Sequence, residues 1–147
     1  MLKVVESVTA GHPDKVCDQI ADAILDEYLR RDPQSKIDIN VMGSNGMLMI
    51  GGQINAKADF DIGALAQKVY KQIGYQDDLE VFVNVDDQTD EMKNAGSGAS
   101  DLVVVNGYAT QETVEMLPRP VVYAHQIART LDNLRKTNPQ FEWLRPD

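Results

Sequence analysis

Two stretches and the turn between them set the expected architecture: Lys36-Ile-Asp-Ile-Asn-Val-Met42, Ser44-Asn45-Gly46 and Met47-Leu-Met-Ile-Gly-Gly-Gln-Ile-Asn-Ala-Lys57. Asn-Gly is the preferred pair for a two-residue hairpin turn. The segments on either side of it have the composition of strands. A β-hairpin is therefore predicted over residues 36–57.

Helices are predicted before and after this hairpin. Residues 15–29 carry an apolar stripe at helical period, with three aspartates on another face. A second helix begins at a capping Asp61 and ends at Gly74. A third follows Pro120 and ends with Arg135-Lys136, basic residues that suit the negative end of a helix.

Two further strands are expected. Glu80–Val85 alternates well enough for one strand, and Leu102–Val105 is a continuous branched run typical of a strand buried on both faces. The order of helices and strands favours a layered α+β fold. One compact unit over residues 1–147 is the expected count. The long polar segment 86–100 is predicted to be a functional or mobile loop.

Composition excludes several classes of protein. The formal net charge of -9 argues against a nucleic-acid partner or an anionic membrane surface. The sequence has no apolar run long enough to span a bilayer, and its N-terminus lacks a signal-peptide core. The single cysteine, Cys17, favours a reducing, cytoplasmic environment and is expected to be a small buried apolar residue.

The stretch Glu6-Ser-Val-Thr-Ala-Gly-His-Pro-Asp-Lys15 is the most informative chemically. It places a Gly-His-Pro turn at a helix start, where backbone N–H groups and the helix dipole attract anions. His12 and Lys15 add donors, and Asp14 adds the hard oxygen ligand that Mg²⁺ prefers beside phosphate. Such a set suits the phosphates of a nucleotide with their metal, although a plain helix cap has the same pattern.

Further blocks follow this motif in order along the chain. They are Asp18–Ala23, Gly46-Met47, Gly51-Gly52, Ile73–Tyr75, Gly107–Thr110 with Glu112-Thr113, Tyr123–His125 and Trp143–Asp147. Together with the opening motif, the blocks resemble those of S-adenosylmethionine synthetases (methionine adenosyltransferases). The resemblance covers nearly the whole chain. It implies an α+β fold with a mixed sheet and helices packed on one face.

The resemblance also implies a reaction. Methionine sulfur attacks the 5′ carbon of ATP, and the leaving triphosphate is then cleaved to phosphate and pyrophosphate. By this resemblance His12 contacts the triphosphate near the leaving oxygen and, with Lys15, is a candidate catalytic residue. Asp14 ligates Mg²⁺, and Glu6 is a second candidate metal ligand of the same motif.

Other positions depart from the family pattern. Gln53 stands where the family has a glutamate that holds the methionine ammonium, so it can accept a hydrogen bond but supplies no charge. Gln88 corresponds to a methionine-contacting glutamine. Asn40 stands at an acidic position that serves a K⁺ site. Asp101 is retained from an ATP-binding block whose neighbours are replaced, and the mobile loop is shortened between residues 88 and 98.

Three functions remain open. In the first hypothesis, the chain is a subunit of a methionine adenosyltransferase that binds ATP and methionine and is active only with a longer partner chain, as a hetero-oligomer. In the second, it is a non-catalytic scaffold or regulatory paralogue that stabilises a catalytic subunit. A fragment of an ordinary synthetase is disfavoured, because the departures at Asn40 and Gln53 would be odd there. Retention of His12, Asp14 and Lys15 favours the catalytic subunit.

Overall fold

The computed structural model describes residues 4–90, 93, 102 and 104–147. The chain forms two compact units, Met1–His12 with Leu102–Asp147, and Pro13–Asp101. The expectation of a single unit with a loop at 86–100 stays a prediction. Residues 91–92 and 94–100 of that loop lie outside the described part of the chain.

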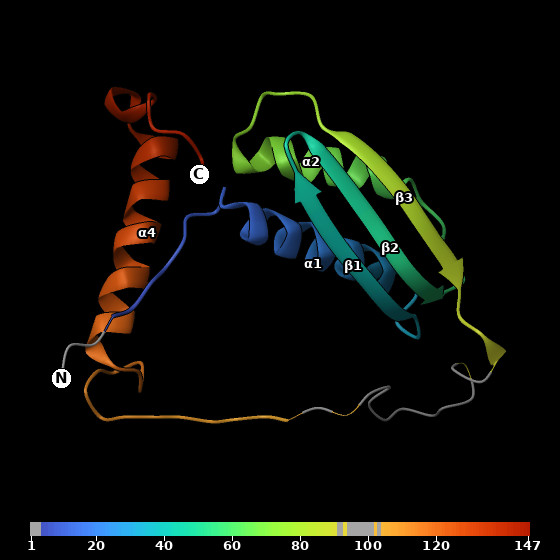
Figure 1. Ribbon diagram of the computed structural model, residues 1–147, viewed down its shortest axis with the longest axis horizontal. Helices are drawn as coiled ribbons and strands as arrows, with labels where there is room; N and C mark the ends of the chain where they lie inside the picture. The colour runs from blue at the N-terminus through green and yellow to red at the C-terminus, as the bar shows by residue number, and fades with distance from the viewer. Residues whose placement is uncertain (1–3, 91–92, 94–101, 103) are drawn as a thin grey trace. The chain divides into compact units, whose positions relative to one another are not determined.

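Among its described residues, the unit Pro13–Asp101 holds a three-stranded sheet with helices α1 and α2 (Figure 1). Its elements are α1 (Pro13–Arg31), β1 (Lys36–Ser44), β2 (Met47–Asn55), α2 (Ile62–Ile73) and β3 (Glu80–Asp87). The strand order is β1-β2-β3, with β1 antiparallel to β2 and β3 parallel to β2. Helix α2 is the crossover that a parallel pair requires. The predicted mixed sheet with helices on one face is confirmed.

The turn and the caps of this unit form as predicted. Asn45 and Gly46 both have positive φ, 48° and 79°, as the favoured two-residue hairpin turn requires. The Asp61 side chain accepts a hydrogen bond from the Ala64 N–H at 2.8 Å, and Gly74 ends α2 with a φ of 125°. Local sequence therefore fixes where the hairpin turns and where α2 begins and ends.

The core of this unit lies between the helices and the sheet. Helix α1 contributes side chains at four-residue spacing, and α2 and β2 contribute the rest: Val16, Ile20, Ile24, Tyr28, Leu48, Ile50, Ile62, Ala66 and Ile73. Burying a large apolar side chain stabilises the fold by roughly 1.5–3 kcal/mol. The Tyr28 ring also packs against Phe60, with centroids 4.6 Å apart.

The other sheet face changes in character along the strands. Met42, Met49 and Phe82 are in register across the three strands and are exposed. At the opposite end, the residues in register are Asp38, Gln53 and Asp86. This face therefore has an apolar end and an acidic end.

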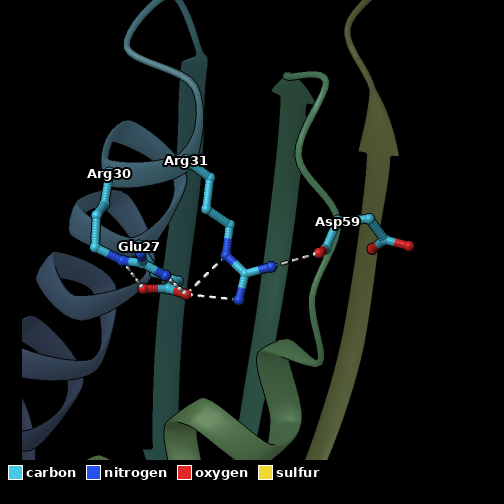
Figure 2. A network of polar contacts seen from close by, with 4 residues as sticks. All are labelled: Glu27, Arg30, Arg31 and Asp59. Carbon is cyan, nitrogen blue, oxygen red and sulfur yellow. Dashed lines mark hydrogen bonds and ion pairs between the residues drawn. The ribbon is translucent and has the colours of Figure 1, made fainter.

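A polar network joins the end of α1 to the segment before α2 (Figure 2). The Glu27 carboxylate accepts hydrogen bonds from Arg30 at 2.7 and 2.8 Å and from Arg31 at 2.7 Å. Arg31 also donates to the Asp59 carbonyl oxygen at 3.0 Å and lies over the Phe60 ring. The hydrogen bonds from Arg30 and Arg31 lower the pKa of Glu27 to about 2.

The second unit is built on α4 (Arg119–Thr137) and a short 3₁₀ helix, η1 (Pro139–Phe141). The strand predicted at residues 102–105 is wrong, because Leu102, Val104 and Val105 belong to no strand and are 92%, 81% and 85% exposed. A branched run forms a strand when a neighbouring strand accepts its backbone and packs its side chains. The described residues of this unit include no such strand.

None of the helices described here is long and apolar enough to cross a bilayer.

Candidate functional site

The opening motif is held along α4 by hydrogen bonds to residues distant in sequence. Ser7 Oγ lies 2.9 Å from His125 Nδ1, and the Ala10 N–H donates to Asp132 Oδ2 at 3.0 Å. His125, the last residue of the Tyr123–His125 block, thus contacts the opening motif and helps to position the segment before His12.

Gly11 is held in place by contacts with Pro146. Its N–H donates to the Pro146 carbonyl oxygen at 2.9 Å, and a Cβ at Gly11 would overlap Pro146. The His12 N–H in turn donates to the Thr9 carbonyl oxygen at 3.2 Å. A glycine is therefore required immediately before His12, where two motif blocks meet.

Helix α1 begins directly after His12. Pro13 is its first residue, a position where the missing N–H costs nothing. Asp14 and Lys15 lie in its exposed first turn, and Lys15 Nζ lies 3.9 Å from Asp18 Oδ2. The first N–H groups of a helix have no partner within the helix and favour anions. His12 belongs to one compact unit, whereas Asp14 and Lys15 belong to the other.

The two predicted methionine-binding residues come together at one end of β2 and β3. Gln53 pairs with Asp86 of β3, and the Gln88 N–H donates to the Ile54 carbonyl oxygen at 2.7 Å. Gln88 is only 7% exposed. Both side-chain Oε1 atoms are buried without a hydrogen-bond partner among the described residues. A buried unpaired amide oxygen costs about 1–3 kcal/mol, so these two atoms are suited to accept from a ligand.

The Gly51-Gly52 pair before Gln53 has a structural cause of its own. Gly52 has a φ of 148°, and a Cβ there would overlap the Asp38 carbonyl oxygen of β1. Asp38 is in register with Gln53, the residue after Gly52. Sequence reasoning missed Asp38 and placed Asp86 in a loop. Predicting the β1–β2 register from the Asn45-Gly46 turn would have identified Asp38.

The other predicted residues are dispersed. Glu6 is exposed in the segment before α1, and Asn40 is exposed on β1 opposite Gly51. Asp101 lies outside the described residues. Within the described part of the chain, no three His, Cys, Asp or Glu side chains are grouped to hold a metal.

Cys17 is half-buried on α1. Burial raises the pKa of its thiol, and the nearby Asp14 and Asp18 carboxylates raise that pKa further. The thiol is therefore kept in its neutral, less nucleophilic form.

Comparison with known proteins covers the whole chain. The N-terminal domain of S-adenosylmethionine synthetase matches residues 1–95, and the central domain matches residues 96–147. The S-adenosylmethionine synthase of Aquifex aeolicus is 38% identical over 99% of this chain and 41% of its own length. That of Sorangium cellulosum is 40% identical over 97% of this chain and 37% of its own length. The chain thus spans about two fifths of the length of the curated relatives that it matches.

Proposed function

Since the chain belongs to the S-adenosylmethionine synthetase family, we propose that it is a subunit of a methionine adenosyltransferase, active only with a longer partner chain. The complex forms S-adenosylmethionine from ATP and methionine and releases phosphate and pyrophosphate. The observation that carries this proposal is the Gly11–Lys15 motif, anchored through Pro146 and leading directly into α1.

The proposed chemistry rests on charge. A thioether sulfur is already nucleophilic and needs no base, whereas a leaving triphosphate needs positive charge and aimed donors. His12 donates to the leaving oxygen, and Lys15 and the α1 N-terminus hold phosphate oxygens. Asp101 contributes to ATP binding, and Gln53 and Gln88 accept from methionine through their buried amide oxygens.

The proposed metal contribution is limited to a few oxygen ligands. Asp14, exposed in the first turn of α1, would hold Mg²⁺. One carboxylate can serve Mg²⁺ beside phosphate oxygens and water. Bound there, Mg²⁺ would supply positive charge against the triphosphate. Glu6 is a further candidate ligand, and Asn40 offers an amide oxygen where a K⁺ ligand would stand.

The distribution of charge supports a second chain. Residues 13–101 carry the entire net charge of -9, because residues 1–12 and 102–147 hold six basic and six acidic side chains. Among the residues of the Gly11–Lys15 motif, Lys15 carries a positive charge and His12 adds a hydrogen-bond donor. Stabilising a triphosphate requires more positive charge than these two supply. We therefore assign the remaining cations to the partner.

Uncovered apolar surface supports the same partner. On α4, Tyr123, Ile127 and Leu131 recur every four residues, are 56%, 63% and 42% exposed, and form one open apolar stripe. An apolar stripe of this kind normally packs against another layer. More than half the length of each relative is unmatched by this chain, so a longer family member can provide that layer.

The proposed location is the cytoplasm, because a chain with a single cysteine suits a reducing environment. The test of the proposed function is to recover the chain together with its partner and to assay the complex. The tagged chain is purified from its native host, its partner is identified by mass spectrometry, and S-adenosylmethionine formation from ATP and methionine is measured. We expect turnover by the complex and none by the chain alone. Turnover by the chain alone, with no other protein detectable, would contradict the proposal.

A scaffold is the second candidate, favoured by the neutral amides at Asn40 and Gln53. It predicts a complex whose turnover does not depend on His12 or Asp14.

A further inference from the structure

We infer that Asp38 and Asp86, which flank Gln53 across the sheet, supply the negative charge that binds the ammonium group of the amino-acid substrate. The inference rests on the proposed function and deepens its methionine site. It assigns a binding role to two residues outside the family motif.

The register of the three strands places Asp38, Gln53 and Asp86 side by side on one face of the sheet. Asp38 of β1 pairs with Gln53 of β2 in the antiparallel ladder, and Gln53 pairs with Asp86 of β3 in the parallel ladder. Directly opposed residues share a face, and their Cβ atoms lie about 5 Å apart. The three side chains therefore form one transverse row, Asp38–Gln53–Asp86, with a carboxylate on each side of the amide.

The amide side chains of Gln53 and Gln88 add hydrogen-bond acceptors beside these carboxylates. Gln53 Oε1 and Gln88 Oε1 are buried acceptors without a partner among the described residues, and Gln88 adjoins this row through its bond to Ile54. Both Asp38 and Asp86 are exposed, so a ligand can reach them. In the adjacent row, Gly51 presents no side chain between Asn40 and Asn84.

The chemistry selects an ammonium ligand. An ammonium group has three donors, and charge-assisted bonds to carboxylates are roughly twice as strong as neutral ones. An amide oxygen alone at residue 53 would leave the positive charge uncompensated.

The test compares methionine with 4-(methylsulfanyl)butanoate, which is methionine without its amino group. Binding of each is measured by calorimetry to the purified complex and to the chain alone, for the wild type, Asp38→Asn and Asp86→Asn. We expect each variant to bind methionine on the order of tenfold more weakly, with the desamino compound unaffected or bound more tightly. Asp22→Asn, an exposed carboxylate of α1 outside the row, is the matched control and should bind methionine as the wild type does.

A rescue separates charge from shape. Gln53→Glu returns one carboxylate to the row and should restore methionine affinity in the Asp38→Asn background. Unchanged preference for methionine over the desamino compound in both Asp variants overturns the inference, even if the complex turns over. A change confined to K⁺ or Mg²⁺ dependence also overturns it, and so does a failure of the complex and the chain to bind methionine. If the complex binds methionine but forms no product, the proposed function is contradicted. The inference is then still decided by the methionine affinities of Asp38→Asn and Asp86→Asn.

Discussion

Gly11 and His12 occupy a turn whose geometry depends on residues far along the chain. The N–H of Gly11 reaches Pro146, and those of Ala10 and His12 reach Asp132 and Thr9. The side-chain types in this turn predict phosphate chemistry, and this role stays a prediction. The sequence could not predict what holds these side chains, because pairings over such a separation leave no local pattern.

His12→Ala should slow the assembled complex by on the order of 10²–10³-fold, because it removes the donor that we propose for the leaving oxygen. The His12 side chain is not among the buried core residues, so the complex should keep its size on a gel-filtration column. Wild-type turnover with this variant would instead favour the scaffold.

Asp14→Asn should raise the Mg²⁺ concentration needed for half-maximal turnover, because a neutral amide is a poorer ligand for a hard cation. The measurement is a Mg²⁺ titration at saturating ATP and methionine. Asp22→Asn, on the same helix and also exposed, is the control. An identical Mg²⁺ curve for the Asp14 variant would remove this residue from the metal site.

At the scale of elements, sequence signals predicted the boundaries of helices and strands correctly where the boundary depends only on neighbouring residues. The Asn45-Gly46 turn, the Asp61 cap and the Gly74 stop each fix a boundary through neighbouring residues. The Leu102–Val105 run failed because a strand depends on a partner strand that composition does not reveal. The row Asp38–Gln53–Asp86 was missed for the same reason, since it exists only once three strands are in register.

The Glu27 network predicts acid sensitivity of α1. The folded-state pKa of Glu27 is lowered from 4.5 to about 2, so its contribution to stability is complete above pH 4.5 and is lost as the pH falls through 2. Glu27→Gln should reduce the loss of unfolding free energy between pH 5 and pH 2, measured by urea denaturation of the chain.

Asp26→Asn, the exposed neighbour of Glu27 outside the network, is the control and should keep the wild-type acid dependence. Equal acid dependence for Glu27→Gln and the wild type would show that the network contributes nothing to stability.

At the scale of the molecule, the chain combines an acidic unit with a neutral one that exposes apolar side chains. Leu131→Asp should release the partner, because a carboxylate on the α4 stripe opposes burial against an apolar layer. Asn133→Asp adds the same charge to an exposed position off the stripe and should remain assembled. The readout is the mass of the complex by light scattering, and retention of the partner by Leu131→Asp would exclude this surface.

The bond between Gly11 and Pro146 also has a consequence for how the protein is made. A ribosome makes Gly11 long before Pro146, so the turn lacks this hydrogen bond while the residues between them are being synthesised. Residues 13–101 form a unit of their own and can fold in between, because domains fold as units during synthesis. The turn before α1 is therefore made early and gains its Pro146 anchor only after that unit has been synthesised.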